Sequence, residues 1–245
     1  MPELPEIETI RRQLEKKIVG KALDKKTIKY VGRRGKMLAI GFNDKEGLVF
    51  HLKLAGQLIF NGIPGKHTRQ VFNFSDGSRL IFNDVRKFGW VKKTKDIGQM
   101  KEIKQLGPDA LKIKEKDFKE LLSKRGKAKI KPLLMDQKFA AGIGNIYADE
   151  ILFAAGINPL RVVKTLTDKE IKNIFYAIKD ILQKAIKMGG SSVRDYVKPD
   201  GKDGGYQKYH KVYQKTGQAC MVCKTPIKRI KLGGRSTHYC PQCQK

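Results

Sequence analysis

Cys220-Met221-Val222-Cys223 and Cys240-Pro241-Gln242-Cys243 are two CxxC pairs separated by sixteen residues, and they contain every cysteine of the 245-residue chain. Four thiolates at this spacing match the tetrahedral coordination of a structural zinc ion. A redox pair or incidental thiols are the alternatives, but one uniform tetrad fits zinc better. Four cysteine ligands leave no coordination position for water, so we predict one structural Zn²⁺ that folds a basic β-hairpin and takes no part in catalysis. The predicted ligands are Cys220, Cys223, Cys240 and Cys243.

The segment between the two cysteine pairs is basic and contains no carboxylate. Near its end Gly233-Gly234 precedes Arg235. An arginine on a hairpin tip beside glycines can approach a phosphate closely. We therefore predict that Arg235 contacts nucleic acid, while a solvated charged face remains the alternative for each single lysine of this segment.

The whole chain is basic, with 52 Lys and Arg against 24 Asp and Glu and a formal net charge of +28. This excess favours a polyanionic partner. A composition of 40% hydrophobic and 31% charged residues is typical of a globular protein and excludes a disordered one. No apolar run approaches the roughly 18 residues of a membrane span, and the N-terminus is too acidic for a targeting peptide. We expect a cytoplasmic, nucleoid-associated protein with no membrane contact.

Hydrophobic periodicity divides the rest of the chain. Residues 3–17 indicate a helix whose acidic residues come first and basic residues last, as the helix dipole favours. Residues 21–95 follow a period of two, with a hairpin signal at Asp76-Gly77. Helical spacing dominates later, from Asn145 to Ala155 and from a capping box at Thr167 to about Met188. The predicted domains are residues 1–111, 112–211 and 212–245.

The N-terminal sequence Met1-Pro2-Glu3 suggests a reaction. Removal of the methionine exposes Pro2 as a secondary amine beside the Glu3 carboxylate. Such an amine attacks a sugar anomeric carbon to form a cationic iminium, which favours elimination of the 3′ phosphate, and the carboxyl group can move the protons. A proline near a helix start is also common without any catalytic role, because its missing N–H costs nothing there.

Longer motifs along the chain decide between these interpretations. They are Met1 to Thr9, Arg33-Arg34-Gly35-Lys36, His51 to Gly56, Asp84 to Gly89, Leu106 to Asp109, Ile130 to Gln137, Gly142 to Ala148 and Asp200-Gly201. In this order, and with the cysteine tetrad, they closely resemble the formamidopyrimidine-DNA glycosylases, which excise oxidised purines and nick the resulting abasic site. The resemblance covers the whole chain and implies an α+β fold, with an N-terminal helix plus β-sandwich followed by a helical domain with a helix-two-turn-helix element and a C-terminal zinc finger.

The resemblance also implies the catalytic residues. Pro2 corresponds to the nucleophile and Glu3 to the acid/base residue, with Glu6 supporting the same site. Lys66 matches a family lysine on a β-hairpin loop that reaches the lesion and its phosphate. From composition alone, Lys66 would be one more solvated lysine.

An enzyme that works on a base inside a duplex must extrude the nucleotide and fill the gap. In the family three side chains do this, and they correspond to Leu54, Arg86 and Phe88. Phe88 would be the apolar wedge, and Arg86 would pair with the orphaned base. Leu54 stands where methionine is more usual. From the residues alone, Leu54 and Phe88 would be core residues, and for Leu54 that alternative stays open.

Phosphate contacts are implied at the start of the helix that follows Gly142-Ile143-Gly144, because free N–H groups at a helix N-terminus hold phosphates. Lys131 and Asn145 match the family's phosphate-binding residues, and Asn145 can also be a plain N-cap. The polar, glycine-rich segment from Ser191 to Tyr209 corresponds to the family's lesion-capping loop. Its length alone suggests a function.

Two departures from the family pattern concern the N-terminal domain. Val85 occupies a position where proline is expected. Less sequence than usual lies between the first helix and Arg33-Arg34, near Tyr30-Val31. We therefore expect a trimmed β-sandwich with an intact active site.

The sequence predicts a DNA-repair enzyme that removes 8-oxoguanine and formamidopyrimidines from duplex DNA and cleaves the abasic site by β- and δ-elimination through an iminium at Pro2. We expect a monomer that binds damaged double-stranded DNA in a basic cleft between its two domains. One alternative is the sister branch specific for oxidised pyrimidines, which Leu4 disfavours because that branch usually has glycine there. The other is a non-catalytic zinc-ribbon protein that binds DNA or ribosomes.

Overall fold

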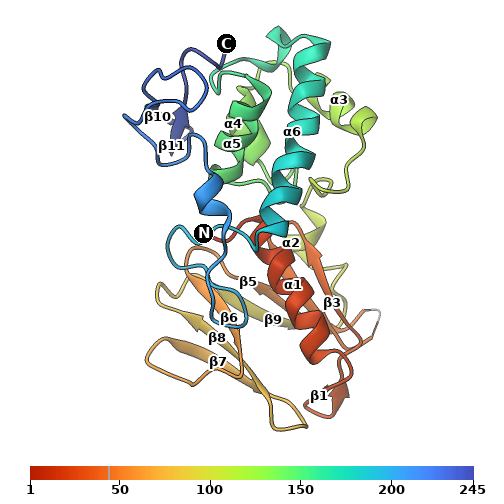
Figure 1. Cartoon of the computed structure of the whole chain (residues 1–245). Coiled ribbons are helices and arrows are strands. Elements are labelled where there is room, and N and C mark those ends of the chain that lie inside the picture. Colours follow the sequence, from red (N-terminus) through yellow and green to blue (C-terminus); the bar gives the residue numbers. More distant parts are fainter. Residues whose placement is uncertain (44) are drawn as a thin grey trace. The chain divides into compact units, whose positions relative to one another are not determined.

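The computed structural model describes residues 1–43 and 45–245, and it divides into two compact units (Figure 1). The first unit contains Met1–Gln105 and Ala185–Gln207, and the second contains Leu106–Lys184 and Lys208–Lys245. In this division residues 185–207 pack with the first unit, and residues 208–245 belong with the helices of the second. The three domains predicted with boundaries after residues 111 and 211 stay a prediction. The glycine-rich loop is therefore part of the unit that carries the N-terminus.

Helix α1 (Leu4–Ile18) begins the first unit, and two glutamates fix its start. The backbone N–H of Glu3 donates to the Glu6 carboxylate at 2.7 Å, and the Glu3 side chain accepts the Glu6 N–H in return. This capping box satisfies N–H groups that the first helical turn leaves without partners. Apolar residues at helical spacing bury one face of the helix against the neighbouring sheet, and they are Ile7, Ile10, Leu14 and Ile18.

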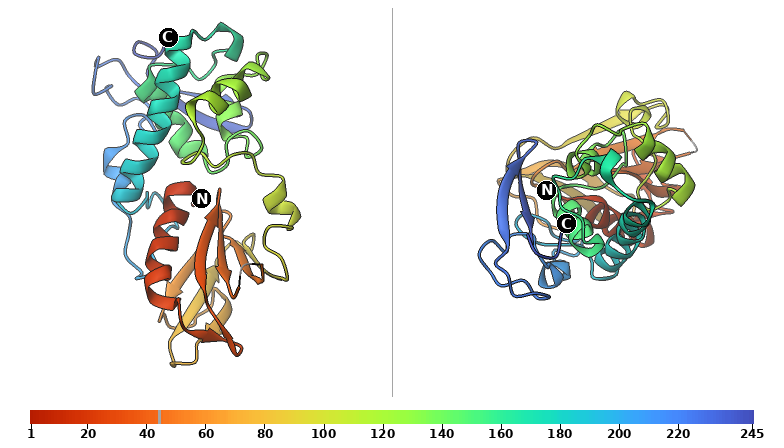
Figure 2. Two further views of the ribbon diagram at one scale, coloured as in Figure 1. Left: turned by 90° about the vertical axis from the view of Figure 1, so that its right-hand side faces the viewer. Right: turned by 90° about the horizontal axis from the view of Figure 1, so that it is seen from above.

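The first unit also contains the predicted β-sandwich. Its strands are β1 (Ala22–Leu23), β2 (Lys26–Thr27), β3 (Tyr30–Arg34), β4 (Met37–Gly41), β5 (Gly47–His51), β6 (Gly56–Phe60), β7 (Thr68–Asn73), β8 (Arg79–Asp84) and β9 (Trp90–Thr94), followed by a short helix α2 (Lys101–Lys104). One antiparallel sheet has the order β3-β4-β5-β9 and the other has the order β6-β8-β7. Helix α1 lies alongside the first sheet (Figure 2).

The core of the first unit lies between the sheets. Phe50 of β5 meets Phe72 of β7 and Phe82 of β8 edge to face, with ring centroids 5.4 and 6.2 Å apart. The period of two predicted for residues 21–95 is confirmed by these strands. Gly77, with φ of +81°, turns β7 into β8, as the Asp76-Gly77 signal indicated.

The second unit is mainly helical. Its elements are α3 (Glu115–Ser123), α4 (Ile130–Met135), α5 (Asn145–Ala155), most of α6 (Asp168–Lys187), and the hairpin of β10 (Lys228–Leu232) and β11 (Arg235–Tyr239), with short 3₁₀ helices over Val163–Thr165 and Tyr206–Tyr209. Helix α5 ends at Gly156, whose φ is +73°. Helix α6 begins with the predicted capping box, in which the Thr167 N–H donates to Glu170 at 2.7 Å. The predicted α+β class is thus confirmed. No helix in the described part of the chain is long and apolar enough to cross a membrane.

Candidate active site and nucleic-acid interface

Pro2, Glu3 and Glu6 lie together at the start of α1. Pro2 is buried, and the two glutamates are each 1% exposed. The Glu6 carboxylate joins two backbone segments, because one oxygen accepts the Glu3 N–H at 2.7 Å and the other accepts the Ser191 N–H at 2.8 Å. The structure therefore brings the predicted nucleophile, acid/base residue and supporting carboxylate to one place, beside the glycine-rich loop.

The environment of the chain terminus favours a neutral amine. Burial lowers the pKa of the Met1 amino group, and the charge of Lys36 lowers it further, whereas Glu3, Glu6 and Asp195 act in the opposite direction. A lowered pKa leaves more of the amine in its nucleophilic form near neutral pH. This direction applies to the Met1 amine, because the Pro2 nitrogen is an amide while Met1 is present.

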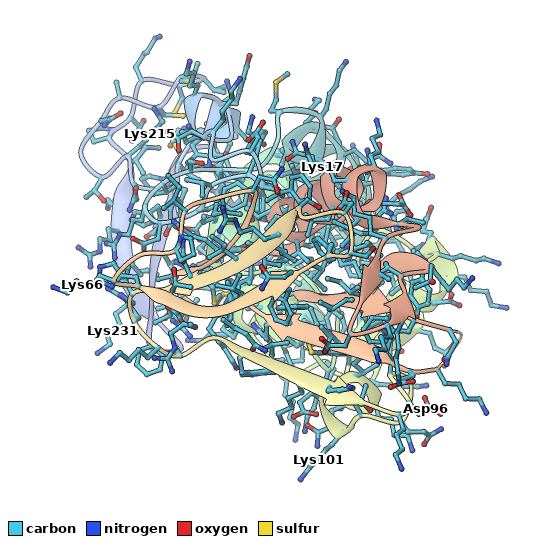
Figure 3. The ribbon with its side chains drawn as sticks, turned by 90° about the horizontal axis from the view of Figure 1, so that it is seen from below. Lys17, Lys66, Asp96, Lys101, Lys215 and Lys231 are labelled. Carbon is cyan, nitrogen blue, oxygen red and sulfur yellow. The ribbon has the colours of Figure 1, made fainter. Side chains whose placement is uncertain are left out.

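Lys36 is a site residue that the sequence did not single out. It follows β3, it is only 8% exposed, and its charge acts on the terminal amine. Its position in the Arg33-Arg34-Gly35-Lys36 motif was the available signal. Lys66 is exposed on the loop between β6 and β7, and its side chain extends into solvent (Figure 3). The role assigned to Lys66 stays a prediction.

The base of the glycine-rich loop packs tightly against Glu6. Gly190 has a φ of +80°, and a Cβ there would lie 2.9 Å from the Glu6 carboxylate and 3.0 Å from the Tyr196 ring. The buried Tyr196 hydroxyl donates to the Gly189 carbonyl at 3.0 Å, and burial, together with the charge of Glu6, raises the pKa of Tyr196 well above its usual value. A side chain at position 190 would be strained, so the loop base and the Glu6 carboxylate form one packed structure.

The far arm of the same loop is tied to the β-sandwich. Gln57 donates to the Asp195 carbonyl at 2.6 Å, and the Phe60 N–H donates to the Pro199 carbonyl at 2.9 Å. Both anchoring residues belong to β6. These contacts explain why residues 185–207 belong to the first unit.

Arg86 and Phe88 lie on an exposed turn after β8. The buried Asp84 carboxylate accepts the Arg86 N–H at 3.0 Å and the Gly89 N–H at 2.6 Å, which fixes both ends of the turn. Phe88 is 62% exposed, so the alternative of a core position is wrong. An exposed aromatic ring on a braced turn has the geometry of a wedge. Its contact with DNA stays a prediction.

Leu54, which is half-buried, lies on a second turn, after β5. His51 braces this turn, because its Nδ1 atom accepts the Lys53 N–H at 3.0 Å. Burial and the charges of Lys53 and Lys36 lower the pKa of His51 to about 4, so the ring is neutral and can accept this hydrogen bond near neutral pH. Intermediate burial leaves both interpretations of Leu54 open.

In the second unit, Lys131 and Asn145 lie in contact at the start of α5. The Lys131 ammonium donates to the Asn145 Oδ1 atom at 2.8 Å, and the Asn145 amide donates to the Ser236 carbonyl at 3.0 Å. Lys131 is 1% exposed, whereas Asn145 is half-buried. Asn145 is the first residue of α5, where helix N–H groups favour anions.

Arg235 is exposed at the tip of the β10–β11 hairpin. Gly233 and Gly234 form the turn with φ of +56° and +73°. Two successive positive φ values are typical of a two-residue hairpin turn, and they explain the glycine pair. Lys231, on β10, is likewise exposed (Figure 3). The hairpin thus presents cations beside the strand that contacts Asn145.

The four cysteines converge at the base of this hairpin. Their sulfur atoms all lie within 4.8 Å of one another, with 3.8 Å between Cys220 and Cys243 and 3.4 Å between Cys223 and Cys240. Zinc–sulfur bonds of about 2.3 Å in a tetrahedron place sulfur atoms about 3.8 Å apart. The donor set and its spacing therefore fit a four-cysteine zinc site.

Family models match three parts of the chain, with the descriptions "Formamidopyrimidine-DNA glycosylase N-terminal domain" (residues 21–91), "Formamidopyrimidine-DNA glycosylase H2TH domain" (residues 106–197) and "Zinc finger found in FPG and IleRS" (residues 217–245). The formamidopyrimidine-DNA glycosylase of Pelotomaculum thermopropionicum is 41% identical over 275 aligned positions, which cover 100% of this chain and 99% of the relative. The chain belongs to the formamidopyrimidine-DNA glycosylase family. It is thus an enzyme, a DNA glycosylase and abasic-site lyase, which excludes the non-catalytic zinc-ribbon alternative.

Solved structures of the family match the whole chain. The complex of Lactococcus lactis Fpg with abasic-site DNA gives a TM-score of 0.90 at 38% identity and covers 99% of both chains. A MutM complex with DNA containing carbocyclic 8-oxo-G gives 0.89 at 38% identity and covers 100% of both. The alignment of 275 positions against 245 residues leaves 30 positions without a residue of this chain. This glycosylase is therefore shorter than that relative.

Proposed function

We propose that the protein removes 8-oxoguanine and formamidopyrimidines from duplex DNA and then cleaves the abasic site by β- and δ-elimination. The buried cluster of Pro2, Glu3 and Glu6 carries this proposal, because removal of Met1 leaves the Pro2 nitrogen as a terminal secondary amine beside two carboxylates, in a family of DNA glycosylases. The solved relatives hold abasic-site and 8-oxo-G DNA, which supports this choice of substrate. Pro2 acts after removal of Met1, since its nitrogen is otherwise an amide.

The reaction balances with these groups. The Pro2 nitrogen attacks C1′, and the glycosidic bond breaks so that its electron pair leaves with the base, which takes up a proton. The nitrogen loses its own proton and forms the iminium as the C1′–O4′ bond opens, while Glu3 donates a proton to O4′. Loss of a C2′ proton expels the 3′ phosphate, and loss of the C4′ proton expels the 5′ phosphate.

DNA binding is assigned to exposed side chains of both units. Phe88 and Arg86 replace the extruded nucleotide, with Leu54 beside them in the same role. Asn145 and Arg235 contact phosphates, and Lys66 reaches the backbone near the lesion. The protein acts on damaged double-stranded DNA as a monomer.

One zinc ion is held by Cys220, Cys223, Cys240 and Cys243. Its bound charge neutralises part of the thiolate charge and fixes the fold of the hairpin. Cys220 and Cys240 are fully buried and pack with Val212 and Ile227, so the cysteine cluster is the core of this small subdomain. With its fold fixed in this way, the hairpin holds Arg235 at a defined place.

Borohydride trapping tests the proposal. The reagent reduces an iminium to a stable amine, so an 8-oxoguanine duplex should become covalently attached to the N-terminal peptide, as mass spectrometry of digests would show. A control variant with two additional residues before Pro2 should give no adduct, because its proline nitrogen is an amide. Equal trapping by that variant would place the nucleophile elsewhere.

The same assay separates the two branches of the family. A duplex with 5-hydroxycytosine should be processed much more slowly than one with 8-oxoguanine. The reverse order would favour the oxidised-pyrimidine branch.

A further inference from the structure

Lys131 is a cation that is almost completely buried inside the second unit, with 1% exposure. Its ammonium donates to Asn145 Oδ1 at 2.8 Å, to the Thr237 hydroxyl at 2.7 Å and to the Ser236 carbonyl at 3.1 Å. It also lies 2.7 Å from a carboxylate oxygen of Asp149. An ammonium has three protons, and four oxygens surround them. No proton of Lys131 is left for a phosphate.

Asp149 completes the network from the other side. Its side chain has no exposed surface, and its second oxygen accepts two hydrogen bonds from His238, from the backbone N–H at 2.9 Å and from Nδ1 at 3.0 Å. A buried ion pair needs good geometry and further hydrogen bonds. Here three hydrogen bonds satisfy the ammonium and two satisfy one Asp149 oxygen, whereas the other oxygen faces the ammonium at 2.7 Å and has no hydrogen bond within the described part of the chain. Moving Lys131 towards a phosphate would leave the Asp149 carboxylate buried without its counter-ion.

The network ends at the two residues that we assign to phosphate contact. The lysine fixes the orientation of the Asn145 amide, because its oxygen must face the ammonium and one N–H then faces the Ser236 carbonyl. An amide nitrogen carries two protons, so in this orientation the Asn145 amide can donate its second one to an incoming phosphate oxygen. The same carbonyl belongs to the residue that follows Arg235, so the start of β11 is held as well.

We propose that Lys131 is a positioning residue that orients Asn145 and the Arg235 end of β11, and that it does not bind phosphate itself. This inference rests on the proposed function, because it presumes that these two residues face DNA. It revises the role that the family resemblance implies for Lys131. The buried charge of Lys131 fixes the geometry of the site, and it does not contribute to the release of counterions from DNA.

The salt dependence of DNA binding distinguishes the two roles. A lysine that neutralises a phosphate contributes about 0.9 to the slope of log affinity against log salt concentration, whereas a neutral amide contributes none. The probe is a duplex with a tetrahydrofuran abasic-site analogue, and affinity is measured over a series of KCl concentrations. Lys131→Met should bind about tenfold more weakly with an unchanged slope. Arg235→Gln should lose close to one unit of slope.

Two further variants keep the test decisive if Lys131→Met folds poorly. Lys131→Met with Asp149→Asn removes both buried charges and retains an acceptor for His238, and it should also keep the wild-type slope. Lys131→Met added to Asn145→Ala should cost little beyond Asn145→Ala alone, because residues that act as a unit are not additive.

Lys179 offers a matched control in the same unit. Its ammonium donates to the carbonyls of Ala110, Leu111 and Ile113 at 3.1, 2.8 and 2.6 Å, and it lies outside the proposed DNA contacts. Lys179→Met should lower thermal stability without weakening DNA binding. A merely structural role for Lys131 would give the same pattern.

Three results would overturn the inference. The first is a salt-dependence slope reduced by about 0.9 in Lys131→Met or in its double variant with Asp149→Asn, which indicates a direct phosphate contact. The second is an unchanged DNA affinity of Lys131→Met. The third is full additivity of the binding free-energy changes of Lys131→Met and Asn145→Ala. Binding to the analogue requires no base excision, so the slopes can be measured even if the proposed chemistry fails. Failure of the chemistry would instead appear as an absence of borohydride adducts with the wild-type protein.

Discussion

Acidification should weaken the first unit through Glu8. Its buried carboxylate accepts hydrogen bonds from Arg11 at 3.1 Å, Arg12 at 2.9 Å and Arg33 at 2.9 Å. Burial alone raises the pKa of Glu8, but the hydrogen bonds from the three arginines outweigh it and lower the pKa from 4.5 to about 2. Because the pKa is lower in the folded than in the unfolded chain, this stabilisation is present above about pH 4.5 and is lost as the pH falls towards 2.

A shift of this size corresponds to about 3 kcal/mol at pH 7, of which about 2 kcal/mol is lost by pH 3. The change to test is Glu8→Gln, which keeps the shape and removes the charge. Urea unfolding at pH 7 and pH 3 should show the variant much less stable than wild type at pH 7 and closer to it at pH 3. Glu15→Gln is the control, because Glu15 is an exposed partner of Arg11 and such pairs contribute little. A difference between wild type and Glu8→Gln that does not depend on pH would refute the reasoning.

Further predictions concern the loops and the metal. Phe88→Ala should change the free energy of unfolding by no more than about 0.5 kcal/mol, because the ring is exposed. It should nevertheless reduce the rate of 8-oxoguanine excision at least tenfold in single-turnover assays, and an unchanged rate would exclude a wedge. Gly190→Ala should slow excision and lower the unfolding free energy by about 1–3 kcal/mol, since the new Cβ meets Glu6 at a positive φ; wild-type kinetics would contradict this. Removal of zinc by a chelator should unfold the hairpin and weaken DNA binding, as circular dichroism and titration would show, while binding that survives would separate the finger from the DNA contacts.

Local signals in the sequence predicted most of the secondary structure. The cysteine spacing, the capping box at Thr167 and the glycine pair before Arg235 each act over a few residues, and each is found as expected. The period of two predicted the strands, whereas their arrangement in a β-sandwich came from the family resemblance. The candidate catalytic residues needed more than local patterns, because a proline near a helix start has an ordinary structural explanation until the other motifs are read with it.

The contacts that organise the candidate site join residues far apart in the chain. Ser191 meets Glu6 across 185 positions, and Thr237 meets Lys131 across 106. Neither pair leaves a periodic pattern in the sequence, so the sequence could not show that residues 185–207 pack with the N-terminus. The burial of Lys36 was hidden for a different reason, since composition does not distinguish one lysine among 40, and only its place in the Arg33-Arg34-Gly35-Lys36 motif set it apart.

The residues assigned to DNA contact must be held in position without being buried in the core. The side chains of Phe88 and Arg235 are exposed and that of Asn145 is half-buried, so packing alone cannot hold them in place. In each case a buried carboxylate or ammonium fixes the backbone or amide beside them: Asp84 braces the Phe88 turn, and Lys131 holds Asn145 and the start of β11. A preorganised site needs such support from behind. We therefore infer two functions for the charged groups of this basic chain: exposed lysines attract any DNA, whereas buried ionic groups of either sign set the geometry of the few side chains proposed to contact it.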